Sequence, residues 1–139
     1  MIETNNVELK RELNDKFEKE VVSFLNSKGG HIFIGINDDG STYGVDNSDE
    51  LQLIIKDRIK DKIAPSPIGF FEIISEERDN KNILHIIIAS GNEKPYYLKK
   101  YGMCPQGTFV RIGSSCVQLT EKQIFDLYSK RTRTSLINI

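Results

Sequence analysis

Acidic side chains near the start of the chain and after a strongly apolar segment are the residues best suited to chemistry. Glu3 and Glu8 lie close together in sequence, and Asp38 and Asp39 follow the apolar run that ends at Ile36. Mg²⁺ usually binds one or two carboxylates together with the phosphates of a substrate. A metal held in this way activates water and stabilises the charge that develops during attack on a phosphodiester. Acidic residues are also common on solvated surface, and spacing alone does not separate these interpretations.

Basic and aromatic side chains form a second candidate site, which would suit nucleic acid. Phosphate groups are contacted by lysine and arginine, and bases stack on tyrosine. A solvated basic surface is the alternative interpretation. A basic and aromatic loop, predicted over residues 99–107, is the type of segment that contacts a ligand. The candidate nucleic-acid-binding residues are Lys10, Arg11, Lys99, Lys100, Tyr101 and Arg111.

Other possible motifs favour structural roles. His31 and His85 lie in predicted strands, where a histidine is more often a packed residue than a ligand or base. No Ser/His/Asp or Cys/His arrangement can be assembled with any specificity. Gly29 and Gly30 end a predicted helix and open a strand, whereas a phosphate-binding loop needs a Lys-Ser/Thr pair opening a helix after a strand. We therefore expect the glycines to terminate the helix.

The segment over residues 21–44 must position the acidic residues. Ile32, Ile34 and Ile36 are predicted to line one face of a strand with Phe33 on the other, and apolar residues on both faces indicate a central strand. The acidic turn after it, over 37–40, is predicted to lead into a strand over 42–45 that pairs back. A preceding half-buried strand over 7–10 would complete a strand–helix–strand path, which would bring Glu8 near Asp38.

Helical periodicity predicts three helices. The first has apolar residues from Leu13 to Leu25 and Asn14 as its predicted N-cap. The second follows Asn47 or Ser48, and the last begins at a capping box formed by Thr120 and Gln123. Strands are predicted over 68–74 and 83–89 as an antiparallel hairpin, with shorter ones over 96–98 and 108–112. The expected fold class is α+β, with a mixed, largely antiparallel sheet of about six strands.

The composition limits the class of protein. The 139 residues, with 38% hydrophobic and 28% charged residues, fit one domain over residues 1–139. No apolar run is long enough to span a membrane, no signal peptide is visible, and the two cysteines have no metal-type spacing. These features predict a cytoplasmic protein with no membrane partner. The net charge of −1 means that any nucleic-acid surface must be a local patch.

Several motifs together resemble the Schlafen AlbA-2 domain family, in the family's order over nearly the whole chain. ETNNVELK at 3–10 is similar to the family's E-S-x-x-V-E-F-K opening, and VSFLNSKGG at 22–30 to A-F-A-N-T-x-G-G. IGINDDG at 34–40 resembles I-G-V-x-D-x-G, and FVRIGSS at 109–115 resembles Y-I-R-x-G-S.

The resemblance implies an α+β domain that binds nucleic acid, either DNA or structured RNA. Bacterial members are described as DNA-binding or transcriptional-regulator domains, often followed by a further module, so we expect the chain to be the N-terminal part of a longer protein. In the animal Schlafen ribonucleases three carboxylates form the cleavage site. By position these correspond to Glu3, Glu8 and Asp38, which would then be both the catalytic residues and the ligands of Mg²⁺ or Mn²⁺. Those enzymes join two lobes in one chain, and we expect this single lobe to form a homodimer.

Two functions therefore remain open. We favour a nucleic-acid-binding domain of a transcriptional regulator, which needs no cofactor, because one lobe of near-neutral charge is a poor clamp and Glu3 lies in a terminus that can fray. The alternative is a divalent-metal-dependent endoribonuclease. The position of Glu3 relative to Glu8 and Asp38 separates the two.

Overall fold

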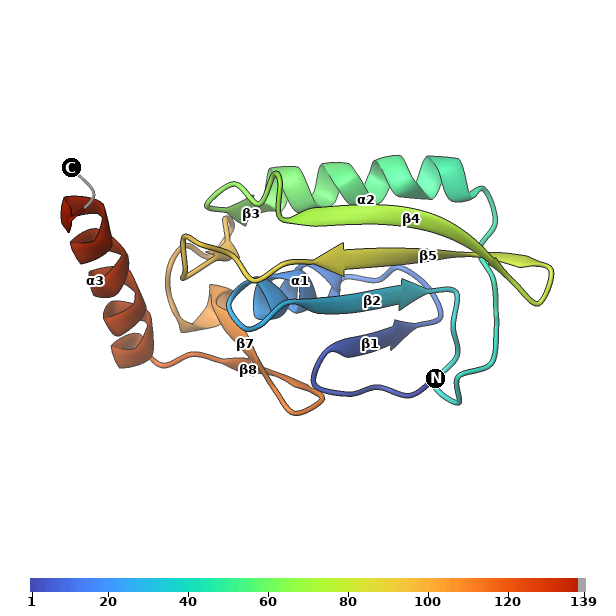
Figure 1. The fold of residues 1–139 in the computed structure, drawn as a ribbon, viewed down its shortest axis with the longest axis horizontal. Helices are drawn as coiled ribbons and strands as arrows, with labels where there is room; N and C mark the ends of the chain where they lie inside the picture. The colour runs from blue at the N-terminus through green and yellow to red at the C-terminus, as the bar shows by residue number, and fades with distance from the viewer. Residues whose placement is uncertain (138–139) are drawn as a thin grey trace.

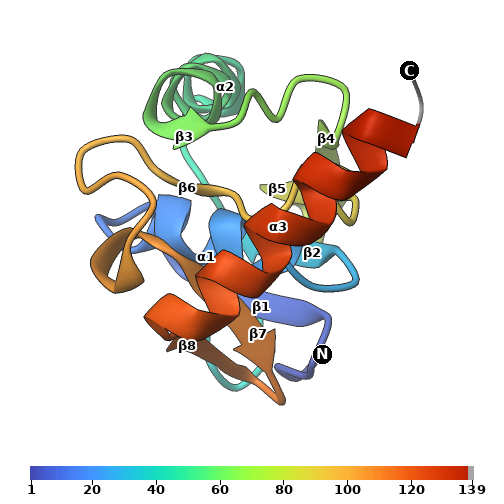
Figure 2. The ribbon, with the colours of Figure 1, turned by 90° about the vertical axis from the view of Figure 1, so that its left-hand side faces the viewer.

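The computed structural model describes the backbone of residues 1–137 and the side chains of residues 1–131. The elements of its larger layer are β1 (Val7–Lys10), α1 (Phe17–Leu25), β2 (Gly30–Ile34), α2 (Ser48–Lys62), β4 (Phe71–Arg78) and β5 (Lys81–Ile88). The four strands form one sheet in the order β1-β2-β5-β4, in which only the β1–β2 pairing is parallel. Helices α1 and α2 lie on one face of this sheet, and no described helix covers the other (Figures 1 and 2).

The remaining elements close one end of the sheet. They are β3 (Ile63–Ala64), β6 (Tyr97–Leu98), the 3₁₀ turn η1 (Pro105–Gly107), β7 (Phe109–Ile112), β8 (Ser115–Gln118) and α3 (Glu121–Ile137). β3 pairs with β6, β7 pairs with β8, and both pairings are antiparallel. α3 crosses this end of the molecule, as Figure 2 shows. The expected α+β class is confirmed, although the described strands are eight in three sheets rather than about six in one.

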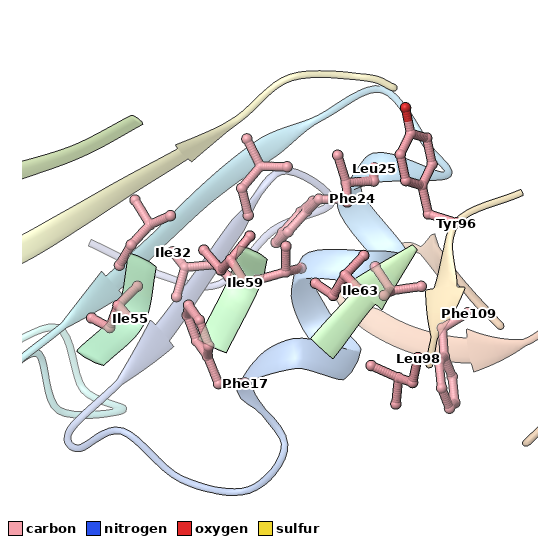
Figure 3. Close-up of a cluster of buried hydrophobic side chains, with 14 of the residues drawn as sticks. Phe17, Phe24, Leu25, Ile32, Ile55, Ile59, Ile63, Tyr96, Leu98 and Phe109 are labelled. Atoms are coloured by element: carbon pink, nitrogen blue, oxygen red, sulfur yellow. The ribbon is translucent and has the colours of Figure 1, made fainter. Parts of the chain in front are cut away.

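The main core lies between β2 and the two helices that cover it. Ile32 and Ile34 are fully buried and pack with Phe17 and Phe24 of α1 and with Ile55 of α2 (Figure 3). β2 pairs with β1 on one side and β5 on the other, which confirms the predicted central strand. Hydrophobic burial of this cluster is therefore what joins the helices to the sheet.

The prediction that Ile36 shares a face with Ile32 and Ile34 is wrong. β2 ends at Ile34 because Gly35 adopts a φ of +100°, which breaks the alternation of side chains along the strand. Ile36 is buried instead in a second cluster with Leu9 and Ile83. Gly35 is needed here, since a Cβ atom on it would lie 3.1 Å from the Gly44 carbonyl carbon and 3.2 Å from a methyl carbon of Ile83.

The predicted strand over 42–45 is reduced to one bridge, between Ile36 and Thr42. The backbone N–H groups of Tyr43 and Gly44 both donate to the Gly35 carbonyl, at 2.7 and 2.8 Å. Two donors on one carbonyl close a tight loop instead of extending a ladder. The acidic turn itself forms as predicted, with the Gly40 N–H donating to the Asn37 carbonyl at 2.9 Å.

The ends of the helices follow local capping, with one correction. α1 begins at Phe17 with Lys16 as its N-cap, whereas Asn14 accepts a hydrogen bond from the Lys16 N–H at 2.9 Å and forms a turn before the helix. Gly29 adopts a φ of +78° and its N–H donates to the Phe24 carbonyl at 3.1 Å, which confirms the glycine stop. The predicted cap of α2 at Asn47 and the capping box of Thr120 with Gln123 are both confirmed.

Within the described part of the chain, every helix is too short or too polar to cross a bilayer.

Ile34→Ala is expected to lower the free energy of unfolding by about 2–5 kcal/mol, because it removes a fully buried side chain and leaves a cavity in the main core. Urea denaturation monitored by circular dichroism would measure the change. Leu53→Ala on α2, where the side chain is 58% exposed, is the matched control and should change it by less than about 0.5 kcal/mol. An equally small effect of Ile34→Ala would contradict the assignment of β2 to the core.

Candidate carboxylate cleft and nucleic-acid interface

The amino-terminal segment folds back along β1, the edge strand of the main sheet. The Thr4 N–H donates to the Val7 carbonyl at 3.0 Å, which closes a turn between them. The Glu3 carboxylate accepts a hydrogen bond from the Leu9 N–H at 3.2 Å. Glu3 itself lies outside the strand, but this bond holds its side chain against β1 and beside Glu8.

Glu3 and Glu8 interact directly. A hydrogen bond with Glu8 raises the pKa of Glu3 above its ordinary value, and partial burial and the negative charge of Glu8 act in the same direction. The hydrogen bond from Leu9 and the positive charge of Arg111 oppose this increase without cancelling it. Glu3 therefore retains its proton more readily than an isolated surface acid would.

Asp38, in the turn after β2, lines the same cleft as Glu3 and Glu8, with a volume of about 410 Å³. The parallel pairing of β1 and β2 brings these parts of the chain together, as the strand–helix–strand path predicts. The cleft runs along the edge strand and continues past it. Its other lining residues are Leu9, Lys10, Arg11, Glu12, Leu13, Asn14 and Lys16.

Arg111 lies beneath this cleft rather than on its surface. Its guanidinium donates to the Glu8 carboxylate at 2.6 Å and to the carbonyls of Thr4 and Val7 at 2.8 and 3.0 Å. The side chain is only 1% exposed and its guanidinium lies 4.8 Å from the centre of the Phe24 ring. A phosphate would have to compete with Glu8 for this cation, so its visible role is to hold the amino-terminal segment.

Lys10 is also paired within the protein. Its ammonium lies 2.8 Å from the carboxylate of Glu20 on α1 and donates to the Asn14 side chain at 3.3 Å. Burial raises the pKa of Glu20, although the bond to Lys10 and its positive charge oppose the increase. Sequence reasoning did not single out Glu20, because a glutamate within a helix looks like an ordinary surface residue until the fold buries it.

Arg11 is the predicted phosphate contact that remains at the surface. No described side chain forms an ion pair with it, and its guanidinium lies 5.0 Å from the centre of the Tyr43 ring. Tyr43 is 47% exposed. Both line a second cleft of about 800 Å³, which also contains Asn80 and Asn82, and Arg11 lines the carboxylate cleft as well. The Arg11–Tyr43 pair thus lies where the two clefts meet. The sequence suggested Tyr43 only as a strand residue.

Lys99 and Lys100 lie elsewhere. They line a separate cleft of about 520 Å³ with Arg58, Lys62 and three acidic residues, and none of the carboxylates of the first cleft is among its lining residues. Lys100 lies 4.9 Å from the centre of the Tyr101 ring. The structure therefore divides the predicted nucleic-acid residues between two surfaces.

The carboxylate cleft can supply only part of the ligand shell of a divalent cation. Among the described residues, no group of three or more His, Cys, Asp or Glu side chains is arranged to hold a metal ion. The Glu3–Glu8 pair nevertheless supplies the one or two carboxylates that Mg²⁺ usually takes when substrate phosphates and water complete its shell. The oxygen donors thus suit Mg²⁺ or Mn²⁺ bound together with a phosphate, rather than an all-protein metal cage.

Fold and cleft together define a small α+β domain with an acidic cleft beside an exposed arginine–tyrosine pair. The chain belongs to the family described as "Schlafen, AlbA_2", whose model matches residues 3–120. The matched region begins at Glu3 and includes every element that lines the cleft. No curated protein matches the chain.

Two solved structures are similar to this fold. The DIP2311 protein from Corynebacterium diphtheriae is 20% identical, with a TM-score of 0.61, over 91% of this chain and 24% of that one. The chain thus spans about a quarter of that protein. The N-terminal domain of a protein from Nitrosomonas europaea, described as related to the ATP-dependent DNA helicase RecG, is 27% identical with a TM-score of 0.58. That match covers 78% of this chain and 79% of the other.

Glu3→Gln is expected to weaken the pH dependence of stability. Because the pKa of Glu3 is raised, the folded state binds this proton more tightly than the unfolded state does. The free energy of unfolding of the wild type therefore falls as the pH rises from the ordinary value of 4.5 through the raised value. The variant has no such titration, so its stability relative to wild type should be higher at about pH 7 than at about pH 4.

Urea denaturation at both pH values would test this expectation. Glu77→Gln, at an exposed position of β4, is the control and should leave the pH dependence unchanged. Identical pH profiles for wild type and Glu3→Gln would show that Glu3 does not share a proton with Glu8.

Proposed function

We propose that this domain binds nucleic acid at the junction of its two clefts. The observation that carries the proposal is the Arg11–Tyr43 pair, an exposed cation without an ion-pair partner among the described residues, which lies against an exposed aromatic ring. Arginine contacts phosphates and tyrosine provides a face for an unpaired base. The family and the RecG-related similarity support a nucleic-acid-related role.

The charge distribution supports a local interface rather than a general polyanion surface. The net charge of the chain is −1, and two of the basic residues that the sequence singled out are paired with Glu8 and Glu20. Few phosphates can therefore be neutralised at once. We expect modest affinity, a shallow dependence on salt, and a preference for substrates with accessible bases, such as RNA loops or single strands. The corresponding biological proposal is a role in transcriptional regulation in the cytoplasm as a homodimer, of which the family supports only the nucleic-acid-related part.

Arg11→Ala is expected to weaken binding and to reduce the slope of log K against log salt by about one, because one phosphate contact is lost. Tyr43→Ala should weaken binding by about 1–3 kcal/mol and leave the slope unchanged, because stacking involves no counterion release. Fluorescence anisotropy with a labelled RNA hairpin and a labelled DNA duplex at several salt concentrations would measure both.

Two further variants make the experiment specific. Lys60→Ala, at an exposed position of α2 that lines none of the clefts described here, is the control and should bind like wild type. The Lys99→Ala, Lys100→Ala double variant tests the loop. If only that double variant weakens binding, the interface lies at the loop instead of at Arg11. If wild type binds neither probe, the domain is not a nucleic-acid-binding module.

Metal-dependent cleavage of RNA is the second candidate function. It is favoured by one observation, the direct contact of Glu3 with Glu8 in a cleft that Asp38 also lines. Glu3 and Glu8 would hold Mg²⁺ or Mn²⁺ jointly with a substrate phosphate, and the ion would activate water and neutralise developing charge. Arg11, at the edge of the same cleft, would orient the RNA backbone. Arg111 would hold Glu8 in position through their ion pair.

Mn²⁺ is expected to raise the melting temperature of wild type, because an ion that binds the folded state stabilises it by mass action. Glu3→Gln should abolish this increase and any cleavage of structured RNA. It is a better test than Glu8→Gln, since Glu3 forms no ion pair with a described residue whereas Glu8 holds buried Arg111. Differential scanning fluorimetry with Mn²⁺ and gel analysis of labelled RNA would report both effects. Equal responses of wild type and Glu3→Gln, with no cleavage, would eliminate the enzyme.

A further inference from the structure

Three titratable side chains form a hydrogen-bonded chain on the face of the main sheet that the helices leave uncovered. His31 on β2 lies 2.8 Å from His85 on β5, between Nδ1 of the first ring and Nε2 of the second. Nδ1 of His85 lies 2.8 Å from the carboxylate of Glu76 on β4. Phe33 stacks on the His85 ring with 4.2 Å between ring centres. Strand register fixes the arrangement, because His85 lies opposite Phe33 on one side and Ile74 on the other.

The partners determine where the protons lie when both rings are neutral. An ionised carboxylate can only accept, so Nδ1 of His85 carries the hydrogen that Glu76 receives. Nε2 of His85 is then an acceptor, and Nδ1 of His31 must donate to it. Nε2 of His31 is left without a hydrogen. No described residue forms a hydrogen bond with this atom.

One added proton reverses this pattern. A proton from solvent binds Nε2 of His31, the Nδ1–H bond of His31 breaks, and that hydrogen passes to Nε2 of His85. The positive charge then lies on His85 beside Glu76, while His31 is neutral with a hydrogen on Nε2. The outer nitrogen thus changes from acceptor to donor. A second proton is opposed by repulsion between the rings.

His31 also lines a cavity of about 610 Å³ between the start of β2 and β7. Lys28, exposed and in no ion pair with a described residue, lines it too, as does Asn5, whose amide can donate. With Nε2 of His31 protonated, all three side chains offer hydrogens. Gly29 and Gly30 also line the cavity.

We propose that this cavity is a proton-gated oxyanion site, which binds a phosphate group through Lys28, Asn5 and the Nε2–H of His31 once the histidine pair has taken up one proton. In the neutral state Nε2 presents a lone pair, which repels an anion. The site lies apart from the carboxylate cleft and does not depend on the nucleic-acid proposal. A phosphate group, free or in a nucleic-acid backbone, has the required chemistry.

The charged groups around His31 are few. His85 lies on β5 and Glu76 beyond it on β4, Lys28 precedes β2, and Arg111 of β7 lines the same cavity with its charge taken by Glu8. Burial lowers the pKa of His31, and the neighbouring His85 adds to this decrease. Both effects favour the neutral form of His31, so anion affinity is gained as the pH falls.

Sulfate is the first probe, because its charge does not change between about pH 5 and pH 8, the range over which histidine titrates. Sulfate is titrated into the whole chain at constant ionic strength, and binding is followed by ¹H–¹⁵N NMR. Sulfate should bind at least about tenfold more tightly at about pH 5 than at about pH 8. His31→Phe, which keeps the ring but has no nitrogen, should abolish this pH dependence. Lys28→Ala should weaken sulfate binding at both pH values, and Lys60→Ala should leave sulfate binding unchanged.

Glu76→Gln distinguishes proton transfer between His31 and His85 from a purely structural role of the Glu76 side chain. Glutamine retains an acceptor for Nδ1 of His85 but lacks the negative charge that favours the added proton. The midpoint pH of the gain in sulfate affinity should therefore be lower than in wild type, and below that midpoint the variant should bind sulfate as tightly as wild type does. A merely structural role would lower affinity without moving the midpoint. Long-range ¹H–¹⁵N spectra of the imidazoles provide a second measurement, with Nε2 of His31 lacking a hydrogen at about pH 8.

A short single-stranded DNA identifies the source of the phosphate. The same pH profile for DNA in wild type, lost in His31→Phe, would assign the site to a backbone phosphate, whereas pH-dependent binding of sulfate alone would assign it to a small free anion. Binding of both probes that is independent of pH, or a protonated Nε2 of His31 at about pH 8, would overturn the proposal.

Discussion

The ion pair between Arg111 and Glu8 is the contact on which the arrangement of the carboxylate cleft depends. The guanidinium comes from β7, late in the chain, and reaches Glu8 in β1 and two carbonyls of the amino-terminal segment. A buried arginine is costly unless its donors are satisfied, so the segment around Thr4 is held where its carbonyls can accept. Glu3 lies in that segment. Arg111 thus ties Glu8 to the segment that carries Glu3, in addition to the bond between Glu3 and the Leu9 N–H.

Charge pairing also determines which residues remain available to a ligand. Lys10 and Arg111, neighbours of the cleft in space, are each occupied by a glutamate, whereas Arg11, adjacent to Lys10 in sequence, lies on a tyrosine ring at the surface. Lys10 is the last residue of β1 and its ammonium pairs with Glu20 on α1, whereas Arg11 follows the strand and is exposed. Lys10 is therefore an internal partner, and Arg11 stays accessible to a ligand.

The uncovered face of the sheet has a different chemistry from the cleft. Its polar groups come from three adjacent strands, and the antiparallel register places them in a line instead of a cluster. A line of hydrogen bonds can pass a proton along it, whereas neighbouring carboxylates suit a cation. Under our two proposals, the uncovered face would respond to pH and the carboxylate cleft to divalent ions.

Local sequence determined the helices, the β4–β5 hairpin, the caps at Asn47 and Thr120, the glycine stop after α1 and the central position of β2, because these depend on neighbours a few residues apart or on hydrophobic periodicity. The motifs also identified the family, and they singled out three carboxylates that line one cleft in the structure. Only the tertiary structure decided that Gly35 ends β2 and that Lys10 and Arg111 form ion pairs within the protein. It also placed Tyr43 against Arg11 and brought His31 within hydrogen-bonding distance of His85. The physical reason is that burial and pairing of charges depend on which strands become neighbours, and strand order is set by long-range packing that no local spacing encodes.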